Sequence, residues 1–423
     1  MKITHVLVAL CLATLSLESR SDSSIADLDF IKDSRLNVLL RNAYISRDYK
    51  NGRQDKAEWG QGAIADFQSG FTTGPVGLGV DGFATYAVRL DGGAGRSGAN
   101  GIDFFKQDGA GHPAPDLARA GASIKMRVFG TVLRYGDLKP ALPVLNTDDS
   151  RLLPESFTGW MVTSQELPNT TLNAGHFTAE ARKSANGRDN GRLQEIDVLG
   201  GRYELSASSS ISAYTSNVKD HLTRYYLGAT QVVALDDRQS VTFDLNGYKT
   251  DIDRAFADSL RTGTDNKIWS AALTYAVGAH QFTLAHQRST GDAGYLYGGY
   301  QSAGYVGDGG GTIFVANSYW SDFNAPGERS WQLGYGIDLA AYGLPGLSYR
   351  IAYVRGTNIH TANAVGTERE LFNQLQYAVQ SGPAKGLKLR LRGSWLRVSA
   401  DVRDYNEDGN EIRAFIDYPM GIF

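Results

Sequence analysis

Hydrophobic and polar side chains alternate with a period of two in the C-terminal part of the chain. From Leu387 to Leu396, one face holds Leu387, Leu389, Leu391 and Trp395, and the other holds Lys388, Arg390, Arg392 and Ser394. The final run repeats the pattern, with Ile412, Ala414, Ile416 and Tyr418 alternating with Arg413, Phe415 and Asp417. A period of two predicts β-strands. The terminal strand stops at the apolar Phe423, and we expect it to pair with another strand.

The three cations of the first run restrict where this strand can lie. Unpaired charges in a packed core would cost several kcal/mol each, and charges that face lipid would each cost roughly 2–4 kcal/mol near the membrane midplane. Three of them would cost about 6–12 kcal/mol, as much as the stability of a whole domain. A membrane barrel with leucine toward lipid and the cations toward a water-filled lumen avoids this cost. One strand of a soluble sandwich, with one face in water, would fit the same residues.

Similar strands follow one another from Ser34 onward. They are predicted at 36–44, 59–70, 78–90, 123–134, 157–165, 171–178, 194–205, 211–217, 223–234, 240–249, 269–276, 281–289, 330–339, 347–355, 371–380 and in the last two runs. With a weak additional strand at Ile102–Gln107, the count is about eighteen, which is in the range of porins. No stretch carries eighteen apolar residues in a row, so the sequence excludes transmembrane helices.

The connections between these strands alternate in length. Short turns, as at 277–280, 344–346 and 381–383, alternate with long polar or glycine-rich segments at 91–101, 136–156, 251–267 and 291–317. Short turns at one end and long loops at the other are typical of an outer-membrane barrel. The 49 glycines, 45 Tyr, Phe and Trp residues (22, 17 and 6) and a mean hydropathy of -0.29 suit alternating strands flanked by aromatic girdles.

The N-terminal residues 1–24 are predicted to be a signal peptide, followed by a single barrel domain at 25–423. Lys2 precedes an apolar run, Ile3–Leu15, that is too short to span a bilayer as a helix. No clean pair of small residues marks the cleavage site. Cys11 is the sole cysteine and lies in this run, so we expect no disulfide and no thiol chemistry in the mature protein. The net charge of -3 gives no indication of nucleic-acid binding.

Short motifs occur in order from Asp33 to Phe423. They are Leu40-Arg41-Asn42 with Arg47-Asp48, Glu58-Trp59-Gly60-Gln61-Gly62, Asp66-Phe67-Gln68-Ser69-Gly70, Gly77-Leu78-Gly79-Val80-Asp81, Leu142-Pro143-Val144-Leu145, Arg151-Leu152-Leu153-Pro154-Glu155-Ser156-Phe157, Asn317-Ser318, Ser321-Asp322-Phe323-Asn324, Pro326-Gly327-Glu328-Arg329-Ser330-Trp331, Tyr353-Val354-Arg355-Gly356 and Gln380-Ser381-Gly382-Pro383. With these motifs the chain resembles the substrate-specific OprD-type porins of Pseudomonas and its relatives.

The resemblance implies an eighteen-stranded monomeric barrel in the outer membrane of a Gram-negative bacterium. Its pore would be narrowed by an infolded loop, lined by a basic ladder, and would pass small carboxylate-bearing nutrients. We expect contacts with outer-membrane lipid and lipopolysaccharide, and with the barrel-assembly machinery through the terminal strand ending at Phe423. Members of the family divide between basic amino acids and aromatic or aliphatic monocarboxylates, and no residue of this sequence decides between them.

The alternation along the strands indicates which cations form the basic ladder. Lys388, Arg390 and Arg392 would follow one strand at intervals of about 6.7 Å. The same alternation turns five further cations toward the lumen, namely Arg41, Lys125, Arg127, Arg350 and Arg413. Guanidinium groups suit a carboxylate because they bind it bidentately. Several weak sites in a row let an anion enter without being trapped.

An acidic set is predicted to face this ladder. Asp148, Asp149 and Glu155 lie in the segment 136–156, whose Leu142-Pro143-Val144-Leu145 and Leu152-Leu153-Pro154 runs suggest apolar anchors inside the barrel. Asp322 would join them. These carboxylates could hold the ammonium end of a substrate, although solvated loop charge is an alternative interpretation.

Other chemistry has little support. Gly77-x-Gly79-x-x-Gly82 lacks the helix of a dinucleotide site, and Asp404-x-Asn406-x-Asp408-Gly409 has Phe415 where a calcium loop needs glutamate. His280 and His286 would stand about 20 Å apart on one strand, too far for one metal. No nucleophile and base pair can be named, so we predict a channel without cofactor or metal, not an enzyme. An outer-membrane lipid or peptide hydrolase, or a loop-borne receptor, is the alternative.

Overall fold

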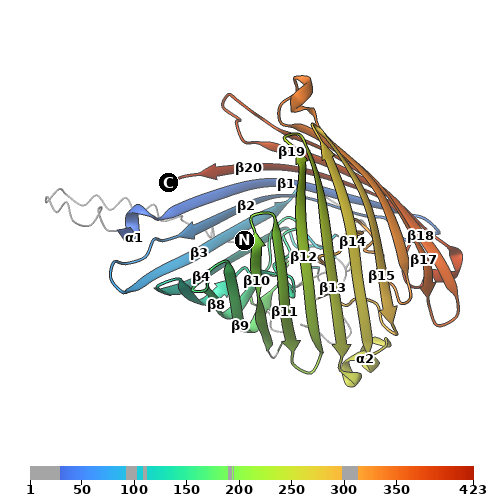
Figure 1. The fold of residues 1–423 in the computed structure, drawn as a ribbon, viewed down its shortest axis with the longest axis horizontal. Coiled ribbons are helices and arrows are strands. Elements are labelled where there is room, and N and C mark those ends of the chain that lie inside the picture. The colour runs from blue at the N-terminus through green and yellow to red at the C-terminus, as the bar shows by residue number, and fades with distance from the viewer. Residues whose placement is uncertain (1–28, 92–101, 108–111, 189–192, 194, 298–312) are drawn as a thin grey trace, which may run out of the picture.

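The protein is a closed antiparallel β-barrel in the computed structural model, which describes residues 29–91, 102–107, 112–188, 193, 195–297 and 313–423 (Figure 1). Within these residues, eighteen strands form one sheet, as the sequence predicts. The strands are β1 (Arg35–Tyr49), β2 (Lys56–Gln68), β3 (Val76–Arg89), β4 (Asp116–Val128), β5 (Thr131–Leu138), β8 (Ser156–Ser164), β9 (Thr170–Ala181), β10 (Ile196–Ser206), β11 (Ser209–Val218), β12 (Leu222–Asp236), β13 (Gln239–Ile252), β14 (Asp265–Val277), β15 (His280–Gly291), β16 (Arg329–Asp338), β17 (Leu347–His360), β18 (Val365–Ala378), β19 (Lys388–Val398) and β20 (Gly409–Gly421). The predicted signal peptide lies outside the described residues.

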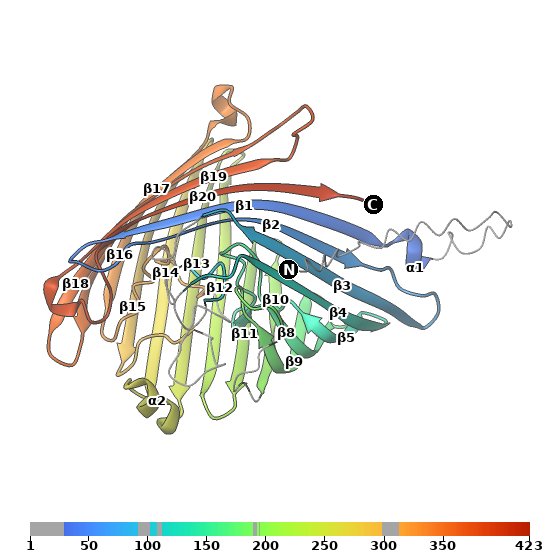
Figure 2. The same cartoon turned by 180° about the vertical axis from the view of Figure 1, so that it is seen from behind.

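The barrel closes where the last strand pairs with the first. β20 lies antiparallel to β1, with Asp417 opposite Arg41. Backbone bonds continue the pairing to the chain end, because Leu36 N–H donates to Phe423 C=O at 3.1 Å and Ile422 N–H donates to Leu36 C=O at 2.8 Å. The prediction that the terminal strand pairs with another is confirmed, and the start of β1 and the end of β20 lie at the end of the barrel that bears the short turns (Figures 1 and 2).

The two faces of the strands divide as the sequence pattern predicts. On β19, Leu389, Leu391 and Trp395 are 39%, 52% and 42% exposed on the outer surface. Arg390 and Arg392 point to the other face and stack on inward-facing aromatic rings. An apolar outer wall and a polar interior are what a membrane barrel requires, and closure of the sheet gives each strand a hydrogen-bonded neighbour on both sides.

One hairpin was missed and one strand was wrongly predicted. The run 123–134 contains parts of two strands, β4 and β5, joined at Phe129-Gly130. Phe129 takes a positive φ of 49° without the usual Asn-Gly signal of a tight turn. Ile102–Gln107 forms no barrel strand and makes only an isolated bridge from Gln107 to Pro113. Its Ile102, Phe104 and Phe105 are instead buried inside the barrel.

The shorter elements lie before β1 or in the connections between strands. They are α1 (Asp29–Lys32), β6 (Ala141–Leu142), β7 (Leu145–Asn146), α2 (Arg254–Leu260) and the 3-10 turns Leu339–Tyr342 and Ala400–Val402. The side chain of Asp253 caps α2 by accepting from Ala255 N–H at 2.9 Å. In the described part of the chain, no helix is long and apolar enough to cross a membrane.

Buried apolar clusters inside the barrel are formed by connections that turn inward. One cluster joins Leu142, Val144 and Leu145 to Phe157 and other wall residues. A second joins Leu152 and Leu153 to Ala43, Ile45 and Phe105. The core of this protein therefore lies between the wall and its infolded connections, and these connections shape the lumen.

Candidate functional site

The connection between β5 and β8, residues 139–155, folds into the lumen, and we call it the infolded segment. It reaches two separate parts of the wall. Pro143 C=O accepts a hydrogen bond from Tyr248 of β13 at 3.1 Å, while Asp149 bonds to Arg41 of β1 at 2.7 Å. Leu142 and Leu145 are 5% and 1% exposed, and Leu152 and Leu153 are 0% and 1% exposed. The predicted apolar anchors therefore hold the segment inside the barrel.

Two glycines of β2 make room for the infolded segment. A Cβ on Gly60 would stand 2.5 Å from Leu152 Cδ2, and one on Gly62 would stand 3.3 Å from Leu153 Cδ2. Both distances are shorter than ordinary carbon contacts of about 3.5–4.0 Å. The Trp59-Gly60-Gln61-Gly62 sequence thus allows leucine side chains to pack directly on the backbone of the wall.

Arg41 links the infolded segment to the barrel closure. Its Nη1 donates to Asp149 Oδ1 at 2.7 Å and to Arg151 C=O at 3.0 Å, and its Nε donates to Asp417 Oδ1 at 2.9 Å. The Arg41 side chain is 6% exposed, whereas Asp149 is 50% exposed. Arg41 is therefore a fully partnered group, and Asp149 presents one side of its carboxylate to the lumen.

Six of the predicted ladder cations lie on neighbouring strands, and we call them the basic track. They are Arg350 on β17, Lys388, Arg390 and Arg392 on β19, Arg413 on β20 and Arg41 on β1. One row of the sheet runs from Arg350 through Gln374 to Arg392 and Arg413. Closure does not place Arg413 directly opposite Arg41, because Arg413 pairs with Ile45 and Arg41 with Asp417.

The track contains both neutralised and uncompensated cations. Arg413 bonds to Glu411 at 2.5 Å, and Glu411 also accepts from Arg47 at 2.7 Å. Arg350, Lys388 and Arg392 make no salt bridge within the described residues, nor does Arg390, whose Nε is buried without a hydrogen-bond partner there. Net positive charge therefore remains on β17 and β19.

Aromatic rings support the guanidinium groups of the track without neutralising them. Arg390 lies over Phe415 at 4.8 Å from the ring centroid, and Arg41 lies near the same ring at 5.9 Å. Arg392 lies over Phe372 at 4.9 Å. Cation–π contacts of this kind orient a guanidinium and leave its donors available.

Lys125 and Arg127 lie apart from the track, toward the short-turn end of the barrel. Lys125 pairs with Asp81 at 2.6 Å and also donates to Ser69 C=O at 2.7 Å. Arg127 lies over the ring of Phe71, in the connection between β2 and β3, at 4.4 Å. The structure therefore brings together six of the eight predicted ladder residues and leaves these two at the mouth.

The four predicted acidic residues have different surroundings. Asp149 faces Arg41. Asp148 is 7% exposed and bonds to Lys183 at 2.5 Å, and its backbone N–H donates to Glu155, which is fully buried. Asp148 and Glu155 thus brace the infolded segment from within. Asp322 is half-buried and accepts from the Ser318 hydroxyl.

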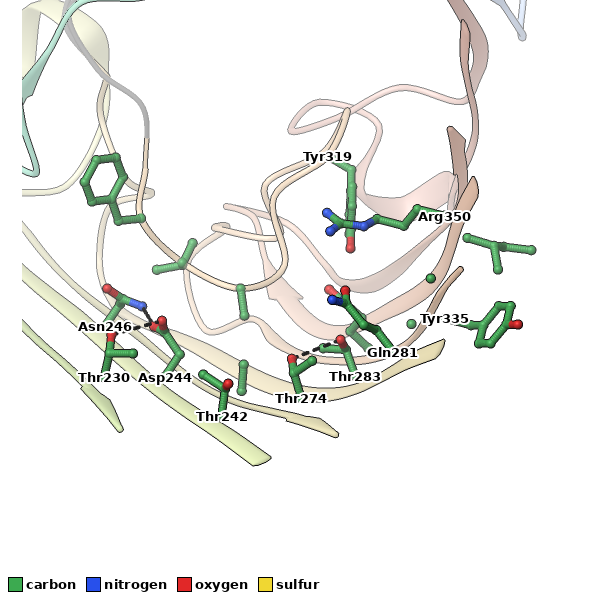
Figure 3. Close-up of a pocket in the computed structure, with 18 of the residues that line it drawn as sticks. Thr230, Thr242, Asp244, Asn246, Thr274, Gln281, Thr283, Tyr319, Tyr335 and Arg350 are labelled. Atoms are coloured by element: carbon green, nitrogen blue, oxygen red, sulfur yellow. Dashed lines mark hydrogen bonds between the residues drawn. The ribbon is translucent and has the colours of Figure 1, made fainter. Parts of the chain in front are cut away.

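A second connection lines the opposite part of the lumen. Residues 313–328 follow the wall from β13 to β18, with Phe314 N–H donating to Tyr248 at 3.0 Å and Ser321 N–H donating to Glu370 at 2.9 Å. Beside this connection is a cavity of about 550 Å³, in which Arg350 extends from the wall and its guanidinium lies beside Tyr319 of the connection (Figure 3). Its polar lining groups also include Thr230, Thr242, Asp244, Asn246, Thr274, Gln281 and Thr283.

Tyr319 does not neutralise Arg350. Burial raises the pKa of Tyr319 to about 12, so its phenol is uncharged at neutral pH. The ring stacks on Phe372 at a centroid distance of 4.3 Å, and Phe372 in turn supports Arg392. Tyr319 and Phe372 thus link Arg350, which lines the cavity, to Arg392 further along the basic track.

Sequence reasoning missed several groups that shape this lining. Phe415 and Asp417, which the sequence pattern placed on one face with Arg413, were given no role in the site, and neither was Glu411; all three lie on the inward face of β20, and the alternation was the signal that could have included them. Tyr319 lies in a connection without any period, so no local signal marked it. Among the described residues no group of three or more possible metal ligands is assembled. Asp408, in the calcium-like motif, instead accepts from Val398 N–H beside the hairpin tip.

A closed barrel with an apolar outer wall and a polar, constricted lumen is an outer-membrane channel. The model of the family described as "outer membrane porin, OprD family" matches residues 28–422. Porin D of Pseudomonas aeruginosa is 38% identical over 418 residues, covering 93% of this chain and 92% of that protein. The porin-like protein GalP of Pseudomonas putida is 32% identical and covers 93% of each chain.

Solved structures agree with these matches. OccAB1 of Acinetobacter baumannii superimposes with a TM-score of 0.86 at 32% identity, covering 95% of this chain and all of that one. OpdK of Pseudomonas aeruginosa, solved with vanillate, superimposes with a TM-score of 0.81 at 28% identity, covering 93% of this chain and all of that one. The chain belongs to the OprD family of outer-membrane porins, which are substrate-specific channels, and it resides in the outer membrane of a Gram-negative bacterium.

Proposed function

We propose that this porin takes up small carboxylate-bearing solutes along the basic track. The observation that carries the proposal is the group of four inward-facing cations, Arg350, Lys388, Arg390 and Arg392, that make no salt bridge within the described residues. Arg390 is half-buried, and its buried Nε makes no hydrogen bond within the described residues, so the wall leaves part of this guanidinium without an acceptor. A carboxylate satisfies such donors bidentately.

The spacing of the track suits passage rather than retention. Lys388, Arg390 and Arg392 follow each other at about 6.7 Å along β19, so a carboxylate can move from one cation to the next. Conduction requires sites strong enough to admit a solute and weak enough to release it. Asp149, half-exposed beside Arg41, could hold a cationic end of the solute on the facing side.

The relatives support a channel over an enzyme. The family whose model matches this chain is a porin family, and Porin D and the porin-like protein GalP are among its relatives. One matched structure, OpdK, was solved with vanillate, an aromatic carboxylate. Whether this chain favours aromatic, aliphatic or amino-acid carboxylates is the question for an uptake panel. The aromatic rings of Phe372, Phe415 and Tyr319 beside the track favour testing aromatic carboxylates first.

The test is the variant Arg390→Gln/Arg392→Gln, expressed in cells that lack other porins. A hydrogen bond to a charged group contributes about 1.5–3 kcal/mol, so carboxylate uptake at low concentration should fall about tenfold or more. The reversal potential in a salt gradient should also shift toward cation selectivity. No lipid-facing contact is lost, so the variant should accumulate normally in the outer membrane.

Arg127→Gln is the matched control, because it removes an inward-facing arginine that lies outside the track. It should retain most of the uptake and most of the selectivity. Wild-type uptake and selectivity in the double variant, at normal abundance, would refute the proposal. Equal losses in the control would show that overall lumen charge, and not the track, is responsible.

A further inference from the structure

The outer surface of the barrel carries a row of arginines near the long-loop ends of five adjacent strands. They are Arg288 on β15, Arg329 on β16, Arg355 on β17, Arg369 on β18 and Arg397 on β19. These strands are neighbours in the sheet, as Figure 2 shows for β15 to β19. These arginines are not part of the basic track, because the track faces the lumen on the other side of the wall.

The register brings these arginines into direct pairs. Arg288 stands opposite Arg329, Arg355 stands opposite Arg369, and Arg369 stands opposite Arg397. Like charges directly opposite one another on a sheet face destabilise it. A bound anion between the strands would turn this repulsion into attraction.

Four of the five arginines have no anionic partner. Arg288, Arg329, Arg355 and Arg369 are exposed and make no salt bridge or side-chain hydrogen bond within the described residues. Arg397 differs, because it donates to Asn410 Oδ1 at 2.9 Å. On the outer face of β9 and β10, by contrast, His176 lies 2.8 Å from Asp197 and so has an acidic neighbour.

The aromatic girdle fixes the level of the row in the membrane. Trp331 and Tyr353, 56% and 41% exposed, each lie one outward-facing position nearer the midplane than Arg329 and Arg355. Such aromatic belts mark the interface between hydrocarbon and headgroups. An arginine on the lipid face costs about 2–4 kcal/mol at the midplane but only about 0–1 near the interface. The row therefore lies at headgroup level, in the leaflet that faces the long loops.

We propose that Arg288, Arg329, Arg355 and Arg369 form a binding site for the phosphate groups of lipopolysaccharide. The glycolipid of the outer leaflet carries phosphates at this depth, and its acyl chains would lie against the apolar wall below the girdle. Guanidinium groups bind phosphate bidentately, and paired arginines offer two such forks to one phosphate. The site is separate from the lumen, so it does not depend on the proposed transport function.

The experiment measures binding of lipid A to the purified, detergent-solubilised porin by native mass spectrometry. The probes are bisphosphorylated lipid A and its fully dephosphorylated form. The test variant is Arg355→Gln/Arg369→Gln, and Arg355→Lys/Arg369→Lys keeps the charge but loses the forked donors. Lys249→Gln is the control, because Lys249 is an outward-facing cation that already pairs with Asp251 at 2.8 Å. Heat-modifiable mobility and wild-type conductance verify that each variant is folded.

We expect the wild type to bind the bisphosphorylated probe at least about tenfold more tightly than the dephosphorylated one, as two charge-assisted hydrogen bonds allow. The glutamine variant should lose this preference, the lysine variant should retain part of it, and the control should retain all of it. Equal binding of both probes by the wild type, full preference in the glutamine variant, or an equal loss in the control would overturn the proposal.

Discussion

Truncating Leu152 and Leu153 should open the channel, whereas removing Arg41 should leave it constricted. Both leucines are at most 1% exposed, and truncating a buried leucine to alanine costs about 2–5 kcal/mol, or about 4–10 kcal/mol for the pair. Arg41 holds the same infolded segment through Asp149 and Arg151. Hydrogen bonds to charged groups contribute about 1.5–3 kcal/mol each, and the half-exposed Asp149 reduces this. Three such bonds would sum to about 4.5–9 kcal/mol before this reduction. We expect the apolar anchors to dominate because exposure and salt weaken only the polar contacts.

Single-channel recordings in planar bilayers measure this difference. Leu152→Ala/Leu153→Ala should give a larger or more variable unit conductance, because the segment leaves the wall. Arg41→Gln should keep the wild-type conductance and become more cation-selective. Leu391→Ala, which truncates an outward-facing leucine that is 52% exposed, is the matched control. High salt screens the Arg41 contacts but leaves the leucine contacts unchanged. The difference in conductance between the two variants should therefore persist in high salt. An Arg41→Gln channel as wide as that of the leucine variant would refute the reasoning.

Three further outcomes are expected. Asp149→Asn removes the carboxylate that faces the track, so reversal potentials should shift toward anions; an unchanged potential would show that Asp149 does not face permeating ions. Burial beside Glu368 raises the pKa of Glu328 well above 4.5, so the folded state keeps a proton that the unfolded state releases. Stability should therefore fall as pH rises above about 4.5, and Tm in detergent should fall less steeply for Glu328→Gln; parallel profiles would contradict this. Gly60→Val overpacks the wall against Leu152 and should cost about 1–3 kcal/mol, seen as a lower Tm.

The strand faces and the barrel closure could be predicted from the sequence because they depend on a local pattern. A period of two fixes which side chains share a face, so the inward positions of Arg390, Arg392 and Arg413 followed directly. The split of 123–134 into two strands could not be predicted in this way. Its turn uses Phe129 with a positive φ, where sequence rules expect glycine or asparagine.

The partners of the charged residues could not be predicted, because they come from distant parts of the chain. Lys125 was assigned to the ladder by its face alone, and only the fold shows Asp81 beside it. Asp148 was expected in the lumen, but it pairs with Lys183. Neither pair has a local period or motif. Alternation therefore predicts which side of the wall a charge occupies, and tertiary packing decides whether that charge is free.

The most direct test of the basic track compares a carboxylate with its uncharged amide as blockers of the single-channel current. Benzoate and benzamide have nearly the same shape, and only benzoate can accept bidentate bonds from Arg390 and Arg392. We predict that benzoate blocks the wild-type channel, that benzamide at the same concentration does not, and that this difference disappears in Arg390→Gln/Arg392→Gln. Equal block by both compounds, or benzoate block that survives in the double variant, would contradict the account.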